Sequence, residues 1–167
     1  QRSIEEMMVS PVSNWVILAG YVGGGVLRGL FTGLIVTIVA SFFVDLQIHN
    51  IWVVVCVVLL TSILFATGGL LTDVFAKKFD DVAIVPTFIL TPLTYLGGVF
   101  YSISLLPDFW QGVSKINPII YMVNAFRYGF LGSSDINIGV AFGLILVFIV
   151  LLTSFAMYLL NRGIGLR

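Results

Sequence analysis

Charged residues are scarce in this sequence. Asp, Glu, Lys and Arg make up 10% of its 167 residues and hydrophobic residues 59%, whereas an ordinary soluble domain has about 25% charged residues. So few charges cannot cover a surface that faces water, and the mean hydropathy is +1.12. With eight basic and eight acidic residues, no net charge favours nucleic acid. These values exclude a soluble domain and a self-contained enzyme, and they predict an integral membrane protein.

Cysteine and histidine occur once each, which excludes an intrachain disulfide and makes a thiolate metal site untenable. We interpret Cys56 as a small buried hydrophobic residue and His49 as an interfacial one rather than a proton relay. The triplet 23–25 (Gly-Gly-Gly) has no preceding strand and no following Lys-Ser/Thr, so it is not a phosphate-binding loop. No nucleophile–base pair or metal-ligand cluster is evident. We therefore expect this chain to bind no metal or cofactor and to be no enzyme.

Long stretches with little or no charge are the main structural signal. Each can supply the ~20 apolar residues that cross a hydrocarbon core ~30 Å thick. Backbone groups in lipid must be hydrogen-bonded within the segment, which requires helices, and a barrel would show alternating segments of ~10 residues instead. The sequence therefore predicts an all-α membrane protein with four transmembrane helices, at 15–43, 51–74, 83–103 and 137–160.

The distribution of basic residues predicts the orientation. If the segment 1–12 is cytoplasmic, five basic residues lie inside and two outside, in agreement with the positive-inside rule. The inner group is Arg2, Lys77, Lys78, Arg162 and Arg167, and the outer pair is Lys115 and Arg127. The tail 161–167 is then cytoplasmic, and Ser114 is external.

The outer connection, 104–136, is long and only weakly polar. It contains an eleven-residue neutral stretch between Lys115 and Arg127, too short to span and typical of a re-entrant or interfacial helix. Several aromatic residues suit a belt at the membrane interface. These are Phe109, Trp110, Tyr121, Phe126 and Tyr128.

The first predicted span contains a glycine ladder and an arginine. Gly25, Gly29 and Gly33 recur every four residues, a spacing that lets helices approach closely in lipid. This face could contact a second copy of the chain or pack within one subunit. Arg28 lies inside the same span, where a charge usually faces protein or water. Structural pairing and lining of a substrate path both fit Arg28; its partners would be carbonyls, hydroxyls such as those of Thr61 or Thr67, lipid phosphate, or water in a cavity.

Three ordered motifs resemble the ABC-2 type permease family. The string Arg-Ser-Ile-Glu-Glu-Met-Met-Val-Ser-Pro-Val at 2–12 resembles its cytoplasmic coupling helix, an amphipathic segment in which Ser3 and Glu6 fit a capping box. Residues 86–101, followed by Leu106-Pro107 and Trp110, resemble its fifth span and outer loop. The outer motif is matched by Asn117, Pro118, Tyr121 and Arg127, with Asn124 where the family often has an acid that could pair with the arginine.

The resemblance covers essentially the whole chain and has several implications. The four predicted spans would be the last four of six in the permease subunit of an exporter of the bacterial inner membrane. Two permease copies would form a homodimer, surrounded by lipid, with two separate ABC ATPase subunits that bind the ATP and magnesium. The residues implied to dock on the ATPase are Arg2, Glu5, Glu6, Met7, Met8, Ser10 and Pro11.

Two other classes of function remain open from the residues themselves. A secondary transporter driven by an ion gradient usually has broken helices and polar residues near the midplane, for which Arg28 is the main candidate. A membrane scaffold without transport activity would need neither broken helices nor polar residues near the midplane. Nucleotide-dependent co-purification with an ATPase would distinguish both from the ABC permease.

Overall fold

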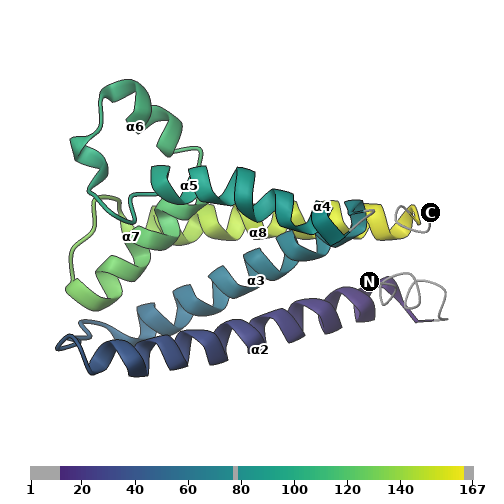
Figure 1. Ribbon diagram of the computed structural model, residues 1–167, viewed down its shortest axis with the longest axis horizontal. Coiled ribbons are helices and arrows are strands. Elements are labelled where there is room, and N and C mark those ends of the chain that lie inside the picture. Colours follow the sequence, from purple (N-terminus) through teal and green to yellow (C-terminus); the bar gives the residue numbers. More distant parts are fainter. Residues whose placement is uncertain (1–11, 77–78, 164–167) are drawn as a thin grey trace.

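A computed structural model describes residues 12–76 and 79–163, which are helical and contain no strand, and it confirms the all-α class (Figure 1). Three long helices run lengthwise, and the start of α2 and the end of α8 lie at one end of the molecule. The elements in chain order are α2 (Asn14–Ser41), α3 (Ile51–Phe75), α4 (Phe79–Ile84), the π-helix η1 (Val85–Leu90), α5 (Thr91–Leu96), the 3₁₀ turn η2 (Ile103–Leu105), α6 (Asp108–Ser114), α7 (Pro118–Leu131) and α8 (Ile138–Asn161).

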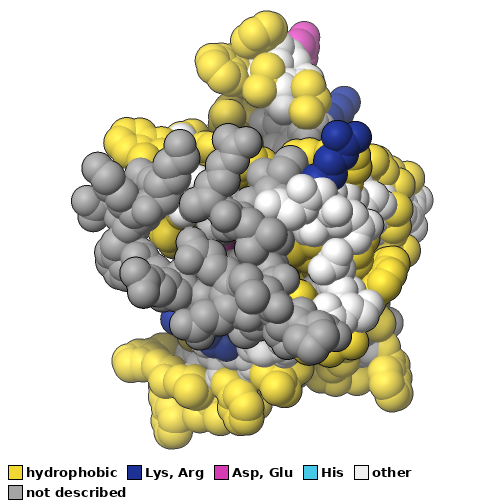
Figure 2. Space-filling view, turned by 90° about the vertical axis from the view of Figure 1, so that its right-hand side faces the viewer, with side chains coloured by type: hydrophobic (Ala, Val, Ile, Leu, Met, Phe, Trp, Pro, Cys, Tyr) yellow, Lys and Arg dark blue, Asp and Glu magenta, His cyan; other side chains and the backbone are white. Residues whose placement is uncertain are grey.

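Helices α2, α3 and α8 are long and apolar enough to cross a membrane, and they correspond to the first, second and fourth predicted spans. Large hydrophobic side chains remain exposed on them, among them Phe31, Phe42 and Trp52. Seen from the end that holds both termini, hydrophobic side chains spread around the periphery of the bundle (Figure 2). Such a surface suits hydrocarbon rather than water.

The third predicted span, 83–103, is wrong in its outer boundary. The described helix runs from α4 through η1 to α5 and ends at Leu96, and its apolar part, Val82–Leu96, is shorter than the three long helices. Pro86 and Pro92 account for the π-helix η1 between α4 and α5, because proline lacks the N–H that an α-helix needs. The hydroxyl of Thr91 donates to the Pro86 carbonyl at 3.1 Å. Gly98, with φ of +74°, then turns the chain back.

Asparagine side chains begin three of the helices. Asn50, Asn117 and Asn137 accept hydrogen bonds from backbone N–H groups in the first turns of α3, α7 and α8 respectively. These side chains satisfy donors that have no partner inside the helix. Gly132, in the left-handed conformation with φ of 71°, ends α7.

Helix α7 packs against α3 and α8 at the end of the bundle opposite the start of α2 and the end of α8 (Figure 1). We call this the outer end, after the orientation predicted from the basic residues. One core cluster joins these three helices and includes Val57, Ile120, Ala125 and Ile145. A second cluster, at the end that holds the termini, joins α2, α3 and α8 through Leu18, Leu70, Leu71, Ala156, Met157, Leu159 and Leu160. The short helix predicted between Lys115 and Arg127 is therefore largely buried in protein.

Candidate functional site

The segment that resembles a coupling helix precedes α2. Its predicted docking residues, Arg2, Glu5, Glu6, Met7, Met8, Ser10 and Pro11, lie outside the described residues, as does Lys78. The start of α2 is described, and it is tied to two other helices. Asn14 Nδ2 donates to Asn161 Oδ1 of α8 at 2.8 Å, and the Tyr21 hydroxyl donates to the Asp73 carboxylate of α3. A force applied just before α2 would therefore reach α3 and α8 as well.

Two glycines of the ladder pack α2 against α3 of the same chain. A Cβ atom added at Gly25 would lie 2.5 Å from Ala66 Cβ, and one at Gly29 would lie 2.6 Å from Ser62 Oγ. No described atom lies within 4 Å of such a Cβ at Gly33. The structure thus assigns Gly25 and Gly29 to packing within the subunit and leaves Gly33 on an open face.

Arg28 is exposed halfway along α2. Among the described residues its side chain has no ion pair, and neither proposed hydroxyl partner bonds to it. Thr67 donates instead to the Ile63 carbonyl at 2.9 Å, and Thr61 is buried without a partner in the described part of the chain. Of the partners that the sequence left open for Arg28, the Thr61 and Thr67 hydroxyls are not bonded to it in this structure.

The side chain of Asn117, in the outer motif, forms hydrogen bonds with backbone groups at the ends of two helices. Its Oδ1 accepts from the Ile119 N–H at 3.0 Å and so begins α7, whose first residue is Pro118. Its Nδ2 donates to the Leu93 carbonyl of α5 at 2.5 Å. That carbonyl is available because the Gly97 N–H bonds to Thr94 instead, at 3.2 Å. The side chain therefore joins the end of α5 to the start of α7.

Tyr121 lies inside the protein rather than in an interfacial belt. Its side chain is buried, and its hydroxyl donates to the Lys115 carbonyl, which holds the turn between α6 and α7. Burial raises the pKa of the Tyr121 hydroxyl. Phe109 and Trp110 of α6 pack edge to face and are exposed, which is compatible with an interfacial belt. The expectation of a belt therefore fails for Tyr121.

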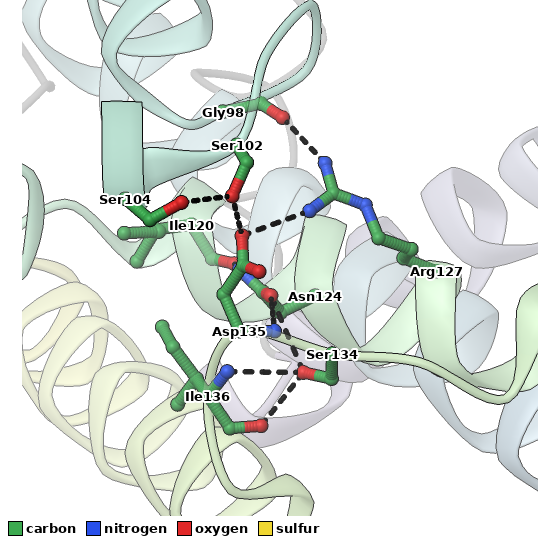
Figure 3. Close-up of polar contacts among 9 residues, drawn as sticks. All are labelled: Gly98, Ser102, Ser104, Ile120, Asn124, Arg127, Ser134, Asp135 and Ile136. Carbon is green, nitrogen blue, oxygen red and sulfur yellow. Dashed lines mark hydrogen bonds and ion pairs between the residues drawn. The ribbon is translucent and has the colours of Figure 1, made fainter. Parts of the chain in front are cut away.

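Arg127 is the centre of a polar cluster at the outer end (Figure 3). Its Nη1 lies 3.1 Å from Asp135 Oδ2, and its Nη2 donates to the Gly98 carbonyl at 2.9 Å. The Ser102 hydroxyl also donates to Asp135 Oδ2, at 2.7 Å. One arginine and one aspartate thus link α7, the turn after α5, and the connection between α7 and α8.

Asn124 has a different role from the acid that the family often has there. It is fully buried; its Nδ2 donates to the Ile120 carbonyl at 2.9 Å, and its Oδ1 accepts from the Asp135 N–H at 2.9 Å and from the Ser134 hydroxyl at 3.2 Å. The carboxylate that pairs with Arg127 comes from Asp135, which the sequence analysis missed. The sequence did contain a clue to this partner, because the outer connection has only two acidic residues that could pair with Arg127, Asp108 and Asp135.

The side chains of the polar cluster around Arg127 can hold segments together but have no evident catalytic chemistry. Among the described residues no three His, Cys, Asp or Glu side chains lie close enough to hold a metal ion. The cluster joins a guanidinium and a carboxylate to carbonyl and hydroxyl groups, all of which act as hydrogen-bond partners. Its physical role is to position the outer ends of helices.

Comparison with known proteins agrees with this architecture. Residues 1–131 match the family described as ABC-2 type transporter. The chain is 58% identical over 168 aligned positions to the inner membrane transport permease YadH of Escherichia coli K12, covering all of this chain and 65% of that protein. It therefore spans somewhat less than two thirds of the length of that relative.

A more distant relative is nodulation protein J of Rhizobium leguminosarum bv. viciae, 22% identical over 97% of this chain and 62% of that protein. No solved structure matches the chain. The family match includes the segment before α2 and the whole of α7, and it covers well over half of the chain. Together with the 58% identical relative, this match shows that the chain belongs to the ABC-2 type transporter family.

Proposed function

We propose that this chain is the membrane-embedded part of the permease subunit of an ABC-2 type exporter in the bacterial inner membrane. ATP hydrolysis by a separate ABC ATPase drives the transport, and this chain binds no nucleotide. The observation on which the proposal rests is the family match over residues 1–131. The name of the 58% identical relative, an inner membrane transport permease, supports the location and the class of activity.

Coupling to the ATPase enters through the segment 1–12 in this proposal. Movement of that segment passes to α2, which is held to α8 by Asn14 and to α3 by Tyr21. Close packing at Gly25 and Gly29 joins the middle of α2 to α3. Movement of the ATPase therefore shifts α2 and α3 together rather than α2 alone.

The proposed assembly contains two permease copies and two ATPase subunits. Both ends of the chain face the cytoplasm in this proposal, which the basic residues support. The start of α2 and the end of α8 lie at one end of the molecule, as this arrangement requires (Figure 1). The polar cluster around Arg127 then lies at the external end. Movement of helix pairs across the interface between the copies opens the path for substrate.

A charge reversal in the full-length permease tests this function. Glu5→Lys with Glu6→Lys should leave membrane insertion intact but weaken nucleotide-dependent co-purification with the ATPase, since a lost charged contact costs about 1–3 kcal/mol. The matched control is Asp45→Lys with Asp108→Lys, two exposed acids on the predicted outer side. Co-purification at wild-type yield in the first variant would show that the segment 1–12 does not dock on an ATPase.

A further inference from the structure

The broken helix α4–η1–α5 is attached to the bundle mainly at its outer end. Among the described residues, the hydrogen bonds that join 85–102 to α7 and to the connections at its two ends are made with Asn117, Arg127 and Asp135. Gly97 also packs closely on Ile119, since an added Cβ would lie 2.6 Å from Ile119 Cγ2. Elsewhere α5 and η1 leave large side chains exposed, such as Phe88 at 72%. These contacts therefore fix the position of the outer end of this helix relative to α7.

Arg127 reaches from α7 to the Gly98 carbonyl, two residues beyond the end of α5. A guanidinium on a long flexible side chain has many orientations, and fixing one of them costs conformational entropy. Asp135 compensates for this cost with a charge-assisted bond to the other nitrogen, Nη1, at 3.1 Å. The two side chains are 23% and 33% exposed, so water screens the pair only partly.

Asp135 is itself held on two sides (Figure 3). Its backbone N–H donates to the buried Asn124 side chain at 2.9 Å, so the connection between α7 and α8 cannot shift freely. Its Oδ2 accepts from Ser102 at 2.7 Å as well as from Arg127. The carboxylate thus has a fixed place relative to α7. It contacts the turn that follows α5 directly at Ser102, and it reaches Gly98 only through Arg127.

We propose that Asp135 is the positioning residue for Arg127: it holds the guanidinium on the Gly98 carbonyl and so pins the outer end of α4–η1–α5 to α7. Asp135 lies outside the part of the chain that matches the family, 1–131. The consequence for transport rests on the proposed function: with its outer end pinned, the broken helix moves at its cytoplasmic part. The positioning itself does not depend on that function.

Hydrogen exchange of the full-length permease in lipid nanodiscs, measured by mass spectrometry, tests this role. Asp135→Asn and Arg127→Gln should each speed exchange of the backbone over 97–105 about tenfold, because both open the same attachment. The double variant should exchange no faster than Arg127→Gln alone, since two residues that act through one contact are not additive. Asp135→Glu should largely restore protection, and Asp108→Asn, an exposed acid on α6, is the matched control.

Three results would overturn the proposal. Exchange over 97–105 in Asp135→Asn could equal that of the wild type, which would mean that Arg127 needs no partner. The effects of the two single variants could multiply in the double variant, which would mean that they act separately. Faster exchange throughout α3, α7 and α8 would indicate general destabilisation. None of these readouts requires an ATPase, so failure of the proposed function would appear separately, in the co-purification experiment.

Discussion

Replacing Gly25 with alanine should weaken the packing of α2 on α3, whereas the same change at the adjacent Gly24 should not. A Cβ atom at Gly25 would lie 2.5 Å from Ala66 Cβ and 3.4 Å from Ala66 Cα. Carbon atoms pack best at about 3.5–4.0 Å, so the helices would have to separate by roughly 1 Å. No rotamer of Ala66 moves its Cβ away, and the backbone itself must shift.

The expected size follows from two opposing contributions. Forcing an extra methyl group into a packed contact costs about 1–3 kcal/mol. Alanine is favoured over glycine inside a helix by about 0.8–1.0 kcal/mol. Gly25→Ala should therefore lower the free energy of unfolding by up to about 2 kcal/mol. At Gly24 no described atom lies within 4 Å of an added Cβ, so Gly24→Ala should be neutral or stabilising.

Gly29 should show an intermediate effect. Its added Cβ would meet Ser62 Oγ at 2.6 Å and Ser62 Cβ at 3.2 Å, and the hydroxyl can rotate away whereas the Cβ cannot. Rotation of the Ser62 hydroxyl cannot make room for a larger side chain, so Gly29→Leu should destabilise the protein more than Gly33→Leu. At Gly33 the added side chain would extend into open space.

Thermal unfolding of the purified full-length permease in detergent, followed by size-exclusion chromatography after heating, would measure these differences. The unfolding midpoint of Gly25→Ala should lie below those of the wild type and Gly24→Ala. Equal losses at Gly24 and Gly25 would refute the assignment of the packing face, because that result would require close neighbours on both sides of α2.

Two further outcomes are expected. Arg28→Leu should fold, bind its ATPase and export substrate, because an apolar residue removes the cost of a charge within a span; a variant that hydrolyses ATP but exports nothing would place Arg28 on the substrate path. In a protein lacking Cys56, an impermeant thiol reagent added outside should label Ile116→Cys but not Arg162→Cys. The opposite pattern would reverse the topology. Ile116 is 76% exposed and replaces Ser114, which is fully buried, as the external probe.

Much of the fold follows from local sequence. Long apolar runs with few charges predict helices in lipid wherever they occur, because each helix satisfies its own backbone groups. The three long helices α2, α3 and α8 accordingly lie where the hydropathy places them. The start of α7 at Pro118 likewise depends on its neighbour Asn117, whose side chain caps the helix within two residues. Such features need no knowledge of distant parts of the chain.

The end of the third predicted span depends on more than hydropathy. Residues 97–103 remain fairly apolar, and their hydropathy alone extends the predicted span to position 103, although Gly97 and Gly98 are poor helix formers. The chain turns at Gly98 instead, and the carbonyl groups freed there find partners in Asn117 and Arg127. Those donors lie 24 and 29 residues away along the chain, so their availability depends on how α7 packs beside α5.

Tertiary structure also decided which residues pair. The glycine spacing in α2 predicted close packing, but only the position of α3 distinguishes Gly25 and Gly29 from Gly33. The outer motif predicted that Arg127 matters, yet its partner is Asp135 and not position 124. Helix formation depends on interactions a few residues apart, which the sequence displays directly. The partners of a side chain depend on which surfaces meet in three dimensions, and that is settled only when the helices pack.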